Sequence, residues 1–139
     1  MQKTYIGTKI IRALPMARQE YNDYRGWELP ANEDGADEGY LVEYLDGGRA
    51  NDSRHAGYIS WSPKDVFERA YRASDAMTFG QALEALKAGK QVARAGWIFE
   101  DAALVPYRPY LALKTAQGDV ATWAPSCSDA LAEDWAVVD

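Results

Sequence analysis

The sequence predicts an α+β protein made of two small domains, each a short antiparallel sheet packed with one or two helices. Short runs of β-branched and aromatic residues alternate with segments that carry helix start and stop signals. A polar joint, "RASDAM", separates two such sets. The 139 residues suffice for one ordinary domain or two small ones. We therefore place the domains at residues 1–75 and 76–139.

The first domain is predicted to have the order β-α-β-β-α. "TYIGTKIIRAL" at 4–14 is rich in strand-forming residues, and Pro15 suits the first turn of a helix that ends at Gly26. Strands follow at 40–44 and 58–62. The last helix begins with Ser62 as cap and Pro63 at its first position, and its apolar face consists of Val66, Phe67, Ala70 and Tyr71.

The second domain is predicted to be one helix against a small antiparallel sheet. Thr78 and Gln81 form a capping box at the start of the helix, and Gly89 ends it. Gln117-Gly118 predicts a tight hairpin turn. The predicted strands span 91–97, 110–115, 119–123 and 135–139.

Composition argues against several functional classes. The net charge of -6 and pI near 4.8 disfavour duplex nucleic acid and membrane surfaces, which attract clustered cations. No apolar run reaches the length of a membrane span, and the N-terminus lacks a signal-peptide core, so we expect a cytoplasmic location. One cysteine and one histidine make a metal site or an internal disulfide improbable. We expect no cofactor.

Catalytic motifs are also weak. Cys127 and His55 are the only conventional nucleophile and base, but they fall in different predicted domains, and His55 lies in a polar loop. Asp129, Glu133 and Asp134 resemble a solvated helical face more than a catalytic pair, although Asp129 also suits a helix cap. We name no catalytic residue, and an enzyme is the third hypothesis.

The C-terminal domain does contain side chains suited to binding a small, polar aromatic molecule. Two tryptophans offer flat faces, two cations offer charge, and four polar side chains offer hydrogen bonds. The same tryptophans also suit a hydrophobic core, and that reading stays open. The candidate ligand-binding residues are Arg94, Trp97, Lys114, Thr115, Thr122, Trp123, Ser128 and Asp129.

Two segments of this domain resemble the second Thoeris anti-defence family of phage proteins. They are "MTFGQALEALKAGKQVARAGW" and "YRPYLALKTAQGDVATWAPSCSDALAEDW". The resemblance implies a non-enzymatic protein that sequesters cyclised ADP-ribose isomers or cyclic oligonucleotides, and that forms homo-oligomers with pockets at subunit contacts. By the family's motifs, Trp97, Lys114, Thr115, Trp123, Ser128 and Asp129 would face the ligand. Leu131 and Trp135, in the "LAEDW" ending, would pack against the sheet as a clasp.

The resemblance is incomplete in one place and leaves an alternative open. Family members usually follow "GW" with "NGK" and a longer stretch, whereas here only twelve residues separate Trp97 from Tyr110. The first half contains "YIGTKIIRALPMARQEYNDYRGWELP", "DEGYLVEYLDGG" and "GYISWSPKDVFERAYR". These segments resemble a module of phage and prophage proteins without an assigned activity. The alternative hypothesis is therefore a phage protein-interaction module that keeps the fold but lacks the pocket, with the surplus aromatic residues of the first half as its surface.

Overall fold

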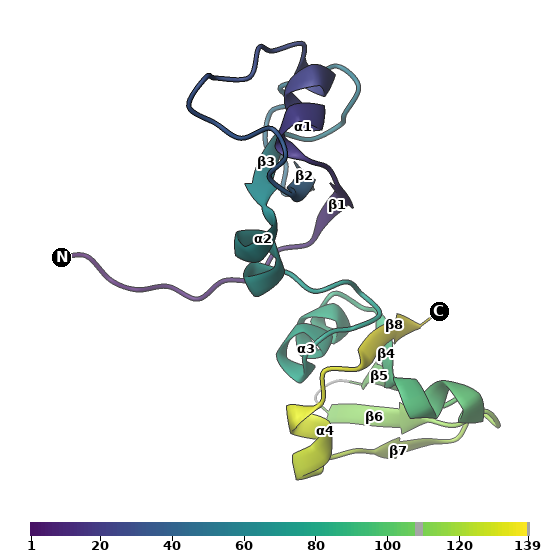
Figure 1. Ribbon diagram of the computed structural model, residues 1–139. Helices are drawn as coiled ribbons and strands as arrows, with labels where there is room; N and C mark the ends of the chain where they lie inside the picture. Colours follow the sequence, from purple (N-terminus) through teal and green to yellow (C-terminus); the bar gives the residue numbers. More distant parts are fainter. Residues whose placement is uncertain (108–109, 139) are drawn as a thin grey trace. The chain divides into compact units, whose positions relative to one another are not determined.

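A computed structural model describes residues 1–107 and 110–138 and divides the chain into two compact units, Met1–Tyr71 and Arg72–Asp139 (Figure 1). Each unit combines a small antiparallel sheet with short helices. The predicted α+β class is confirmed. None of the helices in the described ranges is long and apolar enough to cross a membrane.

The first unit contains a three-stranded antiparallel sheet in the order β1-β2-β3. Helix α1 packs through Tyr21 against Leu41 and Ile59 to form the core of this unit. The element bounds are β1 Ile11–Pro15, α1 Arg18–Arg25, β2 Gly39–Tyr44, β3 Ile59–Pro63 and α2 Lys64–Ala70.

Both helices of the first unit begin later than the sequence suggested. Pro15 is not in the first turn of a helix, because it ends β1 opposite Tyr40. Pro63 is the N-cap of α2, and the Ser62 hydroxyl donates to the Pro63 carbonyl instead of capping helix amides. Gly26, in the left-handed conformation (φ 72°), ends α1 as predicted.

The predicted first strand is shorter than the sequence suggested. Only residues 11–15 pair with β2, while residues 1–10 lie exposed without a strand assignment. The first strand begins only at Ile11 because its partner strand, β2, is short. Ile11 lies opposite Tyr44, the last residue of β2, so residues 4–10 extend past the end of the strand that could pair with them. Strand propensity alone does not make a strand without a partner.

His55 is not the exposed loop residue that the sequence suggested. Its Nε2 lies 2.7 Å from the Tyr24 hydroxyl, and its Nδ1 lies 3.4 Å from Glu43 Oε1. Glu43 also accepts a hydrogen bond from the Gly57 amide. This hydrogen bond is the main reason that the pKa of Glu43 lies below its usual value, and the bond from His55 adds to it. The network fixes the 45–57 loop beside α1.

The second unit contains a five-stranded antiparallel sheet in the order β7-β6-β5-β4-β8. Helix α3 covers one face through Ala82, Ala85 and Leu86, which pack on Val92 and Leu104. The element bounds are α3 Phe79–Lys87, β4 Gln91–Arg94, η1 Ala95–Glu100, β5 Ala103–Tyr107, β6 Tyr110–Lys114, β7 Val120–Thr122, α4 Cys127–Leu131 and β8 Trp135–Val138.

The sheet differs from the prediction between residues 94 and 110. The strand predicted over 91–97 ends at Arg94, where a 3-10 helix begins. Strand β5, which the sequence did not predict, then pairs with β6 from Ala103 to Tyr107. The short connection over 98–109 therefore contains a strand, although Arg108 and Pro109 within it lie outside the described residues.

The hairpin between β6 and β7 is built around Gly118. Its amide donates to the Thr115 carbonyl, and its φ of 87° is a conformation that glycine adopts without strain. The amide of Thr115 donates to the Asp119 carbonyl, which closes a three-residue loop in place of the predicted two-residue turn.

The capping box of α3 is confirmed. The Gln81 amide donates to Thr78 Oγ1 (3.3 Å), and the Thr78 amide donates to Gln81 Oε1 (3.0 Å). We expect Thr78→Ala to lower the free energy of unfolding of this unit by about 1 kcal/mol. Denaturant unfolding followed by tryptophan fluorescence would measure the loss. Thr8→Ala, at an exposed N-terminal position, is the control, and equal midpoints for the two variants would contradict the prediction.

Candidate ligand-binding site

The two candidate tryptophans lie against a third indole in the core of the second unit. Trp135 is fully buried, and the Trp97 and Trp123 rings meet it edge to face at centroid distances of 5.2 and 6.0 Å. Trp97 and Trp123 also meet each other at 5.7 Å. Both remain partly exposed. They therefore contribute to the core and still present part of their rings to solvent.

Arg94 and Asp129 bind each other. Arg94 donates from its Nη1 to Asp129 Oδ1 (3.1 Å) and from its Nε to Asp134 Oδ1 (2.9 Å). Asp129 also accepts from the Ser126 amide, and the Ser126 hydroxyl accepts from the Asp129 amide. These contacts tie the segment between β7 and β8 to the end of β4. Arg94 and Asp129 thus hold the C-terminal segment in place.

The ion pair makes the second unit sensitive to acid. Burial alone would raise the pKa of Asp129, but hydrogen bonds from Ser126 and Arg94 outweigh it and hold the pKa below the usual 3.8. A lowered carboxyl pKa stabilises the fold above the unfolded value, and this stabilisation is lost as pH falls through the folded value.

We expect the unit to lose stability as pH falls below 3.8, and we expect Asp129→Asn to reduce that dependence. Chemical unfolding at a series of pH values, followed by tryptophan fluorescence, would measure it. Asp119→Asn, which changes an exposed acid of the hairpin, is the matched control. An identical pH profile for wild type and Asp129→Asn would contradict the assignment.

The C-terminal clasp is only partly as predicted. Trp135 is buried, its indole N–H donates to the Asp129 carbonyl (3.0 Å), and its backbone exchanges two hydrogen bonds with Met77. Leu131, however, is 83% exposed, so the prediction that it packs on the sheet is wrong. Helix α4 is too short to turn Leu131 toward the core, because it ends at that residue.

Three further candidate residues, Lys114, Thr122 and Ser128, lie outside the indole cluster and the Arg94–Asp129 ion pair. Ala112 pairs with Thr122, so these two residues share one face of the sheet, and Lys114, two residues after Ala112, lies on the same face. Trp123 and the α3 core lie on the opposite face. Ser128 is exposed on α4, where its hydroxyl lies 3.0 Å from that of Ser126. The eight candidate residues therefore form two groups within one chain, one around the indoles and one around Lys114.

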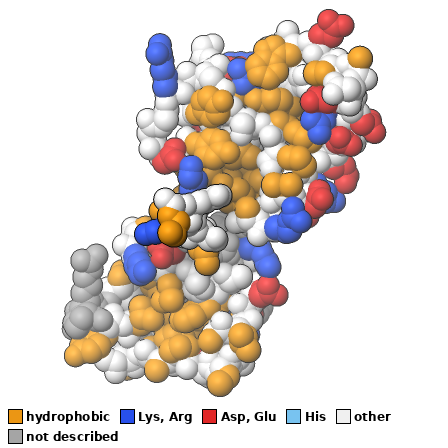
Figure 2. Space-filling view, turned by 90° about the vertical axis from the view of Figure 1, so that its left-hand side faces the viewer, with side chains coloured by type: hydrophobic (Ala, Val, Ile, Leu, Met, Phe, Trp, Pro, Cys, Tyr) orange, Lys and Arg blue, Asp and Glu red, His pale blue; other side chains and the backbone are white. Residues whose placement is uncertain are grey.

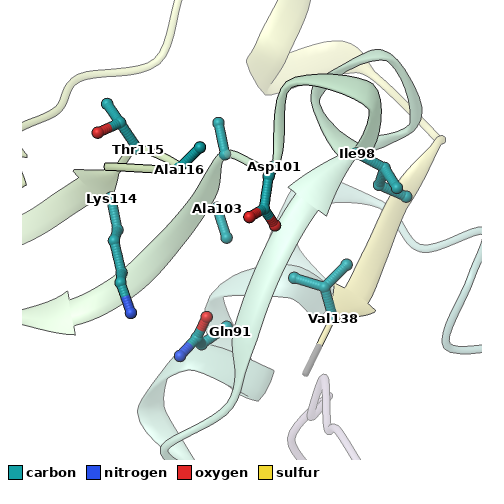
Figure 3. Close-up of a pocket in the computed structure, with 9 residues that line it drawn as sticks. Gln91, Ile98, Asp101, Ala103, Lys114, Thr115, Ala116 and Val138 are labelled. Atoms are coloured by element: carbon teal, nitrogen blue, oxygen red, sulfur yellow. The ribbon is translucent and has the colours of Figure 1, made fainter. Parts of the chain in front are cut away.

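A pocket of about 420 Å³ lies beside Lys114 (Figure 3). Lys114, Gln91 and Asp101 come from three separate elements and surround the same hollow. An ammonium, an amide and a carboxylate thus share one cavity. The full lining is Gln91, Ile98, Asp101, Ala102, Ala103, Lys114, Thr115, Ala116 and Val138.

Thr115 lines this pocket and also carries a buried hydroxyl group. Its Oγ1 is buried, and it has no hydrogen-bond partner among the described residues. Buried hydroxyls are normally hydrogen-bonded, and an unpaired one costs about 1–3 kcal/mol.

The sequence did not identify Gln91 or Asp101 as pocket residues. Gln91 reaches the pocket because it pairs with Val138, and this register is set only when β8 joins the sheet beside β4. Asp101 ends the 3-10 helix in a left-handed conformation (φ 50°), which non-glycine residues adopt rarely. The only local signal was the pair of acids after "GWIF", and acids repel a phosphate-rich ligand.

The fold and the pocket define the second unit as a small α+β domain with a ligand-sized cavity beside its sheet. Residues 77–138 match the Thoeris anti-defense 2-like domain. The chain is also 33% identical over 84 residues to the protein "Thoeris anti-defense 2" of Bacillus phage SP01, a match that covers 45% of this chain and 94% of the relative. The chain belongs to the Thoeris anti-defense 2-like family.

Proposed function

We propose that this protein is a phage or prophage anti-defence protein that sequesters a cyclic nucleotide-derived immune signal in the host cytoplasm without transforming it. The signal would be a cyclised ADP-ribose isomer or a cyclic oligonucleotide. Family membership and the relative from a Bacillus phage support the anti-defence role. The binding role rests on the pocket beside Lys114.

The observation that carries this proposal is the cavity that Lys114 and Thr115 both line, where the Thr115 hydroxyl is buried without a hydrogen-bond partner among the described residues. A nucleotide-derived ligand offers phosphate oxygens to the ammonium and ribose hydroxyls or phosphate oxygens to the threonine. A charge-assisted hydrogen bond contributes about 1.5–3 kcal/mol, and nanomolar binding needs about 12 kcal/mol. Lys114 and Thr115 therefore need further partners.

Self-association supplies such partners in this proposal. The indoles of Trp97 and Trp123 pack on the α3 core, and Trp123 lies on the sheet face opposite Lys114. A head-to-tail contact between neighbouring chains would bring the indoles of one chain to the Lys114 pocket of the next. Partly exposed indoles would then stack on a base, at about 1–3 kcal/mol per base.

Ligand release by mass spectrometry tests this function. The purified protein is incubated with cyclic ADP-ribose isomers and cyclic di- and trinucleotides, freed of unbound ligand and denatured. We expect one nucleotide to be released with unchanged mass after long incubation. Release of a cleaved product would indicate an enzyme, and a folded protein that retains nothing would favour the protein-interaction alternative.

A further inference from the structure

The outer edge of β3 in the first unit borders a second cavity, of about 500 Å³. Its lining includes three consecutive residues of β3, Ile59, Ser60 and Trp61. Consecutive strand side chains point to opposite faces, so a cavity that touches all three lies along the backbone edge. The exposed indole of Trp27 forms part of the wall (52% exposed).

The backbone groups at this edge are only partly used. Tyr44 donates to Tyr58 across the sheet, so in the alternating antiparallel pattern Ile59 and Trp61 direct their N–H and C=O groups outward. The Asn51 side chain binds both groups of Ile59, at 2.8 Å each, as an added strand would. The N–H and C=O of Trp61 have no hydrogen-bond partner among the described residues. One position for an added strand is therefore open.

The N-terminal segment of the chain has the properties of such a strand. Residues 4–10, "TYIGTKI", extend past the end of β2 and lie exposed, with Ile6 99% accessible. The segment is rich in residues that favour strands. Exposed apolar side chains and unpaired backbone are the features that promote pairing between chains.

Charge favours a contact between this segment and the β3 cavity. Residues 1–10 contain two lysines and no acid, and Lys9 pairs with Asp46 at 2.9 Å, so Lys3 carries the charge that the contact can use. Residues 28–38 contain five acids and no base, and two of these acids, Glu28 and Glu33, line the cavity together with Arg18 and Arg25. Arg18 pairs with two of these acids and Lys64 with a third, which leaves a net charge of -3 from five acids and two bases. Figure 2 shows acidic side chains along one margin of this unit, beside a hydrophobic surface.

We propose that residues 4–10 of one chain add as a strand to the edge of β3 in a second copy of this chain. The added strand exchanges hydrogen bonds with Trp61, ends where Asn51 occupies the next position, and places apolar side chains against Trp27. Two chains that exchange these segments reciprocally form a closed dimer. This contact is independent of the ligand pocket in the second unit.

Cross-linking between two differently sized chains tests the contact. Both carry Cys127→Ser, which removes the exposed native thiol; one also carries Ile6→Cys and the other Glu28→Cys. The control pairs Ile6→Cys with Lys87→Cys, on α3. Docking raises the local thiol concentration to the millimolar range, so at micromolar protein we expect the mixed disulfide to form about a hundredfold faster than in the control. Equal rates for the two pairs would overturn the proposal.

Two further measurements separate a second copy from self-contact. A single chain with both Ile6→Cys and Glu28→Cys is expected to give disulfide-linked dimers; a purely intramolecular disulfide would overturn the proposal. Protection of the Trp61 amide from hydrogen exchange is expected to rise with protein concentration. Tyr5→Ser with Ile6→Ser should abolish that rise, whereas Val66→Ser, at an exposed apolar position on α2, should preserve it. Concentration-independent protection would count against a second copy.

Discussion

Trp135→Ala is expected to unfold the second unit or to leave it marginally folded. Replacing a buried tryptophan with alanine costs about 3–5 kcal/mol, and the total stability of a domain is about 5–15 kcal/mol. Trp135 is fully buried and contacts Trp97, Trp123 and Phe79. The substitution leaves three aromatic rings without their common neighbour.

Two polar contacts add to this loss. The indole N–H holds the Asp129 carbonyl of α4, and this bond disappears with the side chain. The backbone of Trp135 also pairs with that of Met77, which joins the start of the unit to β8. Without the buried indole, β8 is held less firmly beside Met77. Trp135→Ala therefore loosens both the clasp and the sheet edge.

Denaturant unfolding and near-ultraviolet circular dichroism would measure the effect. Trp27→Ala, which removes a half-exposed indole from the first unit, controls for the loss of one tryptophan signal. Trp135→Phe should recover part of the stability because it restores most of the ring volume. A cooperative transition for Trp135→Ala at the wild-type midpoint would contradict this view of the core.

The start of α3 and the glycine-terminated ends of α1 and α3 were predictable from the sequence because their signals are local, whereas the starts of α1 and α2 were placed too early. The Thr78–Gln81 capping box and the glycine stops at Gly26 and Gly89 depend on residues within one turn of the helix end. Strand ends depend on partners elsewhere in the chain. Residues 4–10 have strand propensity but no partner, and β5 was missed because "ALVPY" is short and contains Pro106, which lacks an amide hydrogen.

The arrangement of the candidate site was not predictable for the same reason. A shift of one residue along a strand reverses the face of the sheet, so adjacent Thr122 and Trp123 point to opposite sides. The sequence could indicate which groups suit a ligand. It could not show that Arg94 and Asp129 bind each other, because that contact requires α4 to lie beside the end of β4.

Lys114→Glu is expected to abolish retention of the nucleotide-derived ligand while leaving the fold intact. Lys114 lies at the end of β6 and lines the pocket with its charged side chain. Removing a charge-assisted hydrogen bond costs about 1.5–3 kcal/mol, or roughly tenfold to 150-fold in affinity. A carboxylate at this position also repels phosphate and lies near Asp101, so we expect the loss to exceed that range.

Thr115→Val tests the contribution of the Thr115 hydroxyl independently of the Lys114 charge. It removes the unsatisfied Oγ1 with little change of volume, so the fold should keep or gain stability while affinity falls by about tenfold. Lys87→Glu, at an exposed position on α3, makes the same charge change away from the pocket and should retain ligand. Calorimetric titration of each folded variant with the ligand identified by mass spectrometry would rank them. If Lys114→Glu and Lys87→Glu bound equally well, the ligand would occupy another surface, with the partly exposed indoles of Trp97 and Trp123 as the next to test.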